Sequence, residues 1–111
     1  MTKKSISNPT RVQVFENEMF GQIRTMTDER GETFFVGKDV AQALGYKNPQ
    51  KALRDHVDEE DKTLNESFTV NGTHPILINE SGLYSLILSS QLEQARAFKR
   101  WVTSAYRASE T

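Results

Sequence analysis

The sequence predicts a single α+β domain, and three observations lead to this assignment. Near the N-terminus, short segments rich in β-branched and aromatic residues alternate with turn residues, as in an antiparallel meander. Two short amphipathic helical patterns and an Asn-Gly turn signal follow, and the last part of the chain has the apolar spacing of helices. The expected order is an antiparallel three-stranded meander, two short helices in a helix-turn-helix-like pair, a β-hairpin and two C-terminal helices.

Composition is that of an ordinary globular protein. The chain has 111 residues, of which 36% are hydrophobic and 26% charged, so we expect one domain with a substantial core. The absence of cysteine excludes disulfides, thiolate catalysis and cysteine-ligated zinc. The sequence shows no signal peptide and no apolar run near the ~20 residues of a membrane span, which favours a cytoplasmic protein that does not contact membranes.

The N-terminal part predicts the meander. Residues 1–11 are polar and show no periodicity, so we expect a flexible tail before a domain at residues 12–108. Apolar and β-branched residues predict strands at residues 12–15, 20–27 and 33–36. Turn-forming residues between these strands predict turns at residues 17–18 and 28–31.

Two helices joined by a tight turn follow the meander. Gly45 ends the first helix, Asn48 caps the second, and Pro49 fits its first position because proline lacks the N–H that would be unpaired there. The inner faces share apolar residues: Val40, Ala41, Leu44, Ala52, Leu53 and Val57. The outer side of the second helix and the turn before it carries amide and basic residues: Lys47, Gln50, Lys51 and Arg54.

Several sequence words, in a fixed order, carry a family resemblance. They are FVGKDVAQALGY at residues 35–46, DHVD at 55–58, NESGLY at 79–84 and FKRWV at 98–102. Together they resemble the N-terminal domain of the BRO family, which comprises prophage antirepressors and baculovirus repeated-open-reading-frame proteins. The resemblance extends from about residue 12 to residue 102 and implies a role in phage or viral gene regulation, with nucleic-acid binding by this domain. Beyond Val102 the agreement fades, and the second, C-terminal domain common in such proteins is not expected in this chain.

The second short helix carries the residue types that recognise bases. Gln50 is the candidate for pairing with adenine and Arg54 for guanine, because an amide and a guanidinium each match those base edges with two hydrogen bonds. Lys47 and Lys51 would bind phosphates, with Asn48 beside them. The formal net charge of −1 counts against a broadly basic surface, so DNA binding has to use a local face.

A predicted hairpin offers a second set of contacts. Segments 67–70 and 75–78 flank an Asn-Gly turn signal. The tip residues Asn71, Thr73 and His74 would either reach a neighbouring groove, as the wing of a winged helix does, or belong to a hairpin that only covers the core.

Two helices are expected after the hairpin. The first, around residues 83–88, is apolar on nearly all sides and is capped by Asn79 or Ser81. Ser90 and Glu93 have the spacing of a capping box at the start of a last helix over residues 91–107. The exposed side of this last helix carries basic residues: Arg96, Lys99, Arg100 and Arg107. They would form either a row of phosphate contacts or simply the solvated face of an amphipathic helix.

Patterns of catalytic and ligand-binding residues are weak. His56 and His74 lack metal-ligand spacing, and the carboxylates at residues 58–61 lack the spacing of a calcium loop. No glycine-rich phosphate loop is present in the sequence. We therefore expect no enzyme activity, no cofactor and no metal, and we expect His56 to pack or hydrogen-bond at the end of the second helix.

Two functions from different classes remain open. The first is the DNA-binding domain of an antirepressor-type transcriptional regulator from a phage or prophage, acting on double-stranded DNA in the cytoplasm of a bacterial host. The alternative is a protein-interaction module that captures a phage repressor without contacting DNA. Helix-turn-helix modules commonly bind DNA as dimers, but the sequence identifies no surface for a homodimer.

Overall fold

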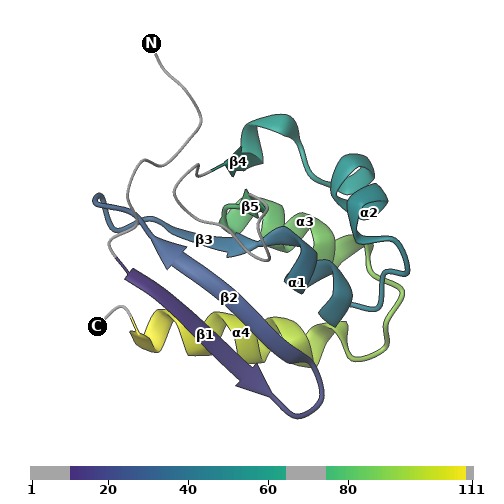
Figure 1. Cartoon of the computed structure of the whole chain (residues 1–111). Helices are drawn as coiled ribbons and strands as arrows, with labels where there is room; N and C mark the ends of the chain where they lie inside the picture. The colour runs from purple at the N-terminus through teal and green to yellow at the C-terminus, as the bar shows by residue number, and fades with distance from the viewer. Residues whose placement is uncertain (1–10, 65–74, 110–111) are drawn as a thin grey trace.

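The protein, as a computed structural model that describes residues 11–64 and 75–109, has one antiparallel sheet and four α-helices (Figure 1). The five strands, in the sheet order β1-β2-β3-β5-β4, are β1 (Arg11–Asn17), β2 (Gly21–Thr27), β3 (Thr33–Val36), β5 (Ile76–Ile78) and β4 (Lys62–Leu64). The helices are α1 (Gly37–Ala43), α2 (Pro49–His56), α3 (Glu80–Ser89) and α4 (Ala95–Ser109), and a 3-10 turn, η1 (Glu59–Asp61), follows α2. The predicted α+β fold is confirmed.

The N-terminal meander has the predicted order. In β1 and β2, Phe15 lies opposite Ile23, and β2 pairs in turn with β3. Polar side chains hold both turns: Asn17 accepts two backbone N–H groups at 2.8 and 3.1 Å, and Asp28 accepts two at 2.9 Å. β1 begins at Arg11, and residues 1–10 of the predicted tail lie outside the described residues.

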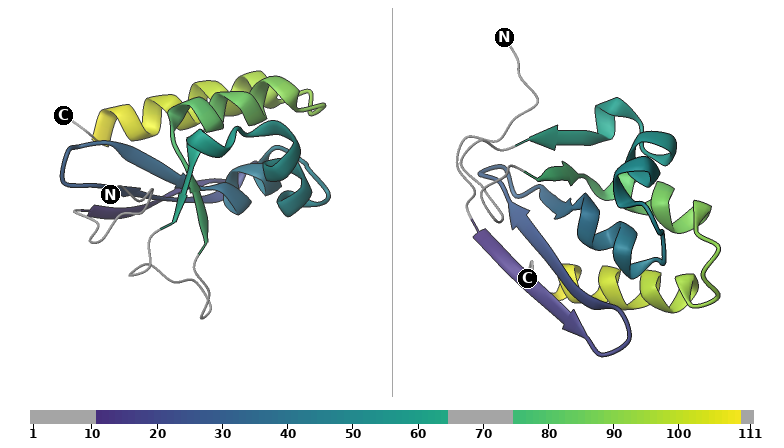
Figure 2. Two further views of the ribbon diagram at one scale, coloured as in Figure 1. Left: turned by 90° about the horizontal axis from the view of Figure 1, so that it is seen from above. Right: turned by 45° about the vertical axis from the view of Figure 1, so that its right-hand side comes forward.

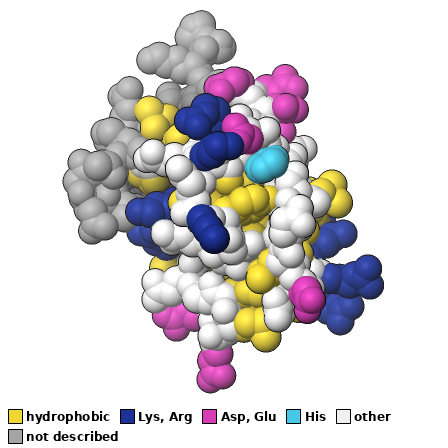
Figure 3. All heavy atoms as spheres, turned by 90° about the vertical axis from the view of Figure 1, so that its right-hand side faces the viewer, with side chains coloured by type: hydrophobic (Ala, Val, Ile, Leu, Met, Phe, Trp, Pro, Cys, Tyr) yellow, Lys and Arg dark blue, Asp and Glu magenta, His cyan; other side chains and the backbone are white. Residues whose placement is uncertain are grey.

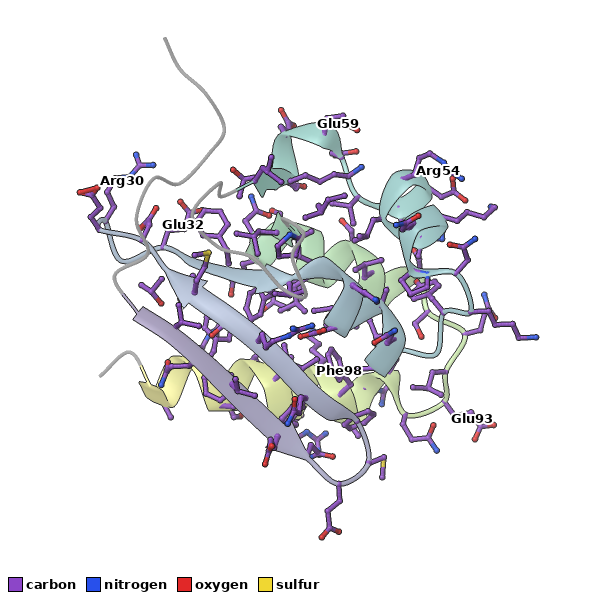
Figure 4. All side chains as sticks on the ribbon, viewed as in Figure 1. Arg30, Glu32, Arg54, Glu59, Glu93 and Phe98 are labelled. Carbon is purple, nitrogen blue, oxygen red and sulfur yellow. The ribbon has the colours of Figure 1, made fainter. Side chains whose placement is uncertain are left out.

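Alternate positions along the strands separate the apolar side chains into two clusters. Figure 2 shows that α3 and α4 cover one face of the sheet. The larger cluster lies on this face and includes Ile23, Phe35 and Ile78. The smaller cluster, on the opposite face, consists of Met26, Phe34, Val36 and Leu77. Figure 4 shows Phe98 of α4 pointing toward the sheet, where it is fully buried.

α3 occupies the centre of the molecule, as its apolar sequence predicts. Asn79 caps the helix by accepting the N–H of Gly82 at 2.9 Å. A Cβ atom at Gly82 would lie 3.0 Å from the Cβ of Ile78 and 3.2 Å from Cγ1 of Val57. Glycine therefore lets the first turn of α3 approach both the sheet and the end of α2.

The predicted start of the last helix is wrong. α4 begins at Ala95, and Ser90 and Glu93 do not form a capping box. The Ser90 hydroxyl instead accepts the N–H of Leu92 at 3.0 Å and donates to the C=O of Leu44, also at 3.0 Å. This long-range bond holds the α3–α4 connection against the end of α1.

The strand pair after η1 also differs from the predicted hairpin in its bounds. β4 begins at Lys62, before the predicted strand at 67–70, and pairs with β5 so that Thr63 lies opposite Leu77. β4 therefore lies where the sequence predicts no strand. The predicted strand 67–70 and the hairpin tip lie outside the described residues.

An ion pair joins α1 to the sheet. Asp39, in the first turn of α1, is 7% exposed and accepts three hydrogen bonds from Arg24 of β2. The donors are the backbone N–H at 3.0 Å, Nε at 2.7 Å and Nη2 at 2.6 Å. These bonds offset the cost of burying the carboxylate, which also lies favourably near the positive end of the helix dipole.

We predict that Asp39→Ala lowers the free energy of unfolding by about 2–4 kcal/mol, because Arg24 would lose its partner at a site partly removed from water. Urea denaturation measures this loss. Asp55→Ala is the matched control, since Asp55 is also ion-paired but 38% exposed, and its loss should be much smaller. Equal losses in the two variants would show that the buried pair does not hold α1 on the sheet.

Candidate nucleic-acid interface

α2 begins as the sequence predicts. Gly45 ends α1 in the left-handed conformation, with φ of +83°, which glycine adopts without strain. Asn48 caps α2 by accepting the N–H of Lys51 at 3.1 Å, and Pro49 occupies the first helical position. The apolar residues Ala52, Leu53 and Val57 are buried against the core. The predicted inner face of this helix is confirmed.

The outer side of α2 exposes the predicted contact residues. Gln50, Lys51 and Arg54 face solvent, and Figure 4 shows Arg54 directed away from the molecule. The preceding turn exposes two more of them, so that five predicted residues share one area, which we call the α2 surface: Lys47, Asn48, Gln50, Lys51 and Arg54. The Asn48 side-chain oxygen is already engaged as the helix cap.

An acidic residue, Asp55, lies beside the α2 surface and is not among the contact residues predicted from the sequence. The Asp55 carboxylate accepts a hydrogen bond from Lys51 Nζ at 2.5 Å and lies 4.0 Å from Nε of Arg54. The hydrogen bond from Lys51 lowers the pKa of Asp55, with further lowering by the nearby positive charges. Asp55 is therefore ionised at neutral pH and offsets part of the positive charge beside it. The spacing of four residues from Lys51 was the available signal.

Further acidic residues lie next to the α2 surface in the chain. Asp58, Glu59 and Glu60 are exposed, and Lys62 Nζ lies 3.2 Å from the Glu59 carboxylate. Asp61 instead binds Asn79, whose Nδ2 donates to its carboxylate at 3.2 Å. Figure 3 shows Asp and Glu side chains beside the Lys and Arg group nearest the histidine. These carboxylates border the α2 surface but leave its five residues exposed.

His56, at the end of α2, packs as predicted. Its ring centre lies 5.6 Å from that of Tyr46, in a tilted arrangement. The Tyr46 hydroxyl donates to the C=O of Leu86 at 2.8 Å, so this ring connects α2 to α3.

The predicted cations of α4 belong to a different surface. Arg96, Lys99 and Arg100 are exposed, and within the described residues no ion pair joins them to an acid. Lys99 Nζ lies 5.6 Å from the centre of the Tyr84 ring. The views of Figures 1 and 2 place α3 between α2 and α4, and Figure 3 shows Lys and Arg side chains in separate groups. The structure thus does not bring these cations onto the α2 surface.

Arg107, which the sequence groups with those cations, binds a carboxylate of α3. Glu80 accepts hydrogen bonds from Arg107 Nη2 at 2.9 Å, from the Tyr84 hydroxyl at 3.3 Å and from the Tyr106 hydroxyl. The bonds from Tyr106 and Arg107 lower the pKa of Glu80, and burial together with Glu80 raises the pKa of Tyr106 to about 12. The cluster joins the start of α3 to the end of α4, which is a structural role.

We predict that this cluster makes stability depend on pH in acid. Because the folded state lowers the pKa of Glu80 below its ordinary 4.5, the stabilisation is present above pH 4.5 and is lost as the pH falls through the lowered value. In urea unfolding, the difference between wild type and Glu80→Gln should therefore shrink below about pH 4.5. The difference should stay under about 1 kcal/mol, since the Glu80 side chain is 44% exposed to screening solvent.

The control for this experiment is Glu29→Gln, which removes one carboxylate from the exposed β2–β3 turn. A wild-type advantage over Glu80→Gln that stays constant down to pH 3 would contradict the role of the charged carboxylate.

The described residues cover only some of the other features that the sequence predicts. Asn71, Thr73 and His74 lie outside the described residues, so the predicted wing stays a prediction. Within residues 11–64 and 75–109, no three His, Asp or Glu side chains are grouped so that they could hold a metal ion. In the same residues, no helix is both long and apolar enough to cross a bilayer.

The fold and the α2 surface define a class of protein: a small α+β domain with a helix-turn-helix-like pair whose second helix exposes amide and basic side chains. The chain belongs to the BRO family, because residues 22–108 match the N-terminal domain of that family. The resemblance predicted from the sequence words is confirmed.

Relatives come from viruses and a bacterium. The chain is 42% identical over 88 residues to Bro-N domain-containing protein 289L of Invertebrate iridescent virus 6, covering 62% of this chain and 21% of that protein. It is 38% identical over 81 residues to an uncharacterised protein of Haemophilus influenzae, covering 72% of this chain and 40% of that one. It is 32% identical over 97 residues to an uncharacterised Bro-N domain-containing protein of Autographa californica nuclear polyhedrosis virus, covering 72% of this chain and 30% of that protein.

The chain thus spans less than half of the length of each of these relatives. No solved structure shows a significant match to it.

Proposed function

We propose that this domain binds double-stranded DNA through the α2 surface, as the DNA-binding part of an antirepressor-type transcriptional regulator. One observation carries the proposal: Gln50, Lys51 and Arg54 are exposed together on a short helix whose opposite side is buried. Membership of the BRO family supports it. A helix that is anchored on one side and polar on the other fits the major groove.

The residues of the α2 surface have different roles in this proposal. Gln50 and Arg54 are four positions apart and therefore lie on the same side of α2, where both reach base edges. Lys47 and Lys51 bind phosphates on either side of the groove. The helix N-terminus adds a partial positive charge that also favours phosphate.

Asp55 limits binding that does not depend on sequence. Its carboxylate repels phosphates and holds Lys51 at 2.5 Å, so the α2 surface attracts an arbitrary duplex weakly. Selective binding then depends on base contacts more than on charge. This agrees with the formal net charge of −1 for the whole chain.

We predict that Arg54→Ala lowers affinity for a preferred site, found by selection from random duplexes, by about 1–3 kcal/mol. Affinity for random duplex should fall less, because Arg54 is proposed to contact a base. Titration of labelled duplexes measures both. Arg30→Ala is the matched control: Arg30 lies in the β2–β3 turn, is exposed, and is far from Arg54 in Figure 4. Similar losses in the two variants would remove Arg54 from base recognition.

We predict that Asp55→Asn raises affinity for all duplex sequences by roughly threefold to tenfold and steepens the salt dependence, because it removes a negative charge and releases Lys51 to phosphate. The same titrations at several salt concentrations measure this. Glu29→Gln, the same charge change in the β2–β3 turn, should have little effect. Unchanged affinity for Asp55→Asn would place bound DNA away from the α2 surface.

The acidic residues beside α2 favour a second candidate function, in which the domain captures a phage repressor protein without contacting DNA. Salt distinguishes the two. DNA binding through several phosphates should weaken by orders of magnitude between about 50 and 200 mM salt, whereas a largely apolar protein interface should change far less. Absence of duplex binding even at 50 mM salt, with capture of the repressor, would support the second candidate.

A further inference from the structure

β1 forms one edge of the sheet. Its only neighbour in the described part of the chain is β2, which pairs with it along all seven residues from Arg11 to Asn17. In an antiparallel pair, alternate residues direct their N–H and C=O groups toward the neighbouring strand. The other residues of β1 therefore direct theirs away from the sheet.

The contact between Gln13 and Thr25 shows which residues these are. The C=O of Gln13 lies 3.5 Å from Oγ1 of Thr25 on β2, so it is directed toward β2. Alternation then directs the N–H and C=O groups of Val12, Val14 and Glu16 outward. Within residues 11–64 and 75–109, these groups make no backbone hydrogen bond outside the strand pairing.

Within the described residues, β1 lacks several of the features that protect an edge strand. It contains no proline and no lysine, and its register with β2 runs without a bulge. Val12 and Val14 are 48% and 50% exposed on the face opposite α3 and α4. An unbroken edge with half-exposed valines is suited to pairing with another strand.

We infer that β1 of a second copy of this chain pairs with this edge in antiparallel fashion, around Val14. Val14 is the middle residue of the seven, so a two-fold axis beside it places the whole strand opposite its counterpart. Val14 then lies opposite Val14 of the second copy, and Val12 opposite Glu16. No two like charges oppose each other, and the four valines form one apolar patch on the same face.

The second copy is favoured as occupant by this self-complementarity of length, apolar positions and charge. The inference rests on β1 (Arg11–Asn17) alone. It does not depend on the proposed DNA binding, and either can fail without the other. A seven-residue strand pair is a small interface, so the dimer should be weak, in the micromolar range or above.

Sedimentation equilibrium from about 1 μM to 1 mM tests the inference. Wild type should show a monomer–dimer equilibrium in this range. Val14→Lys should raise the dimer dissociation constant at least tenfold, because two introduced ammonium groups would face each other. Leu88→Lys is the matched control: Leu88 is 84% exposed on α3, and its variant should dimerise like wild type. A monomeric wild type at 1 mM, or equal weakening by both substitutions, would overturn the inference.

Disulfide formation tests the register, because the natural chain contains no cysteine. Opposed residues of antiparallel strands have Cα atoms about 4.5–5.5 Å apart, within the range of a disulfide. Val14→Cys should therefore form a covalent dimer under mild oxidation much faster than Leu88→Cys. In Val12→Cys the two thiols would be offset by about 13 Å along the strands and should react slowly. Faster cross-linking through position 12 than through position 14 would overturn pairing around Val14.

Discussion

Burial of one side of α2 is the constraint on which the arrangement of the exposed residues depends. The helix has eight residues, fewer than the roughly 12–15 that an isolated helix needs to be even marginally stable in water. Its conformation is therefore stabilised by packing of Ala52, Leu53 and Val57, together with the cap from Asn48. The helical period then fixes which residues face outward. Gln50, Lys51 and Arg54 are exposed together because their neighbours in the sequence are buried.

The body on which α2 packs is held by interactions of different kinds. Arg24 and Asp39 join α1 to β2 through three hydrogen bonds to one carboxylate, and Ser90 joins the end of α1 to the α3–α4 connection. Gly82 allows α3 to contact both Ile78 and Val57. Buried residues thus fix where α2 lies, whereas the charges beside it, such as that of Asp55, are on exposed side chains.

The parts of the fold that depend on local signals could be predicted from the sequence. Asn48 with Pro49, and Gly45, are local signals, and they mark the start of α2 and the end of α1 correctly. Two of the errors involve partners that are distant in sequence. Ser90 looks like a local cap, but its hydroxyl binds Leu44, 46 residues away. Arg107 looks like one cation of an exposed row, but it binds Glu80, 27 residues away. No spacing rule within a helix reveals such partners.

The positions of the two surfaces in the fold make the proposed pairing compatible with the proposed DNA binding. β1 is an edge of the sheet, and α2 packs against α1 and α3 and lies away from β1 in Figures 1 and 2. A second copy at β1 would leave both α2 surfaces exposed, related by a two-fold axis. A two-fold pair of recognition helices binds DNA sites with two-fold symmetry. If both proposals hold, the preferred duplex should contain an inverted repeat, and Val14→Lys should weaken binding to the full repeat more than to a single half-site.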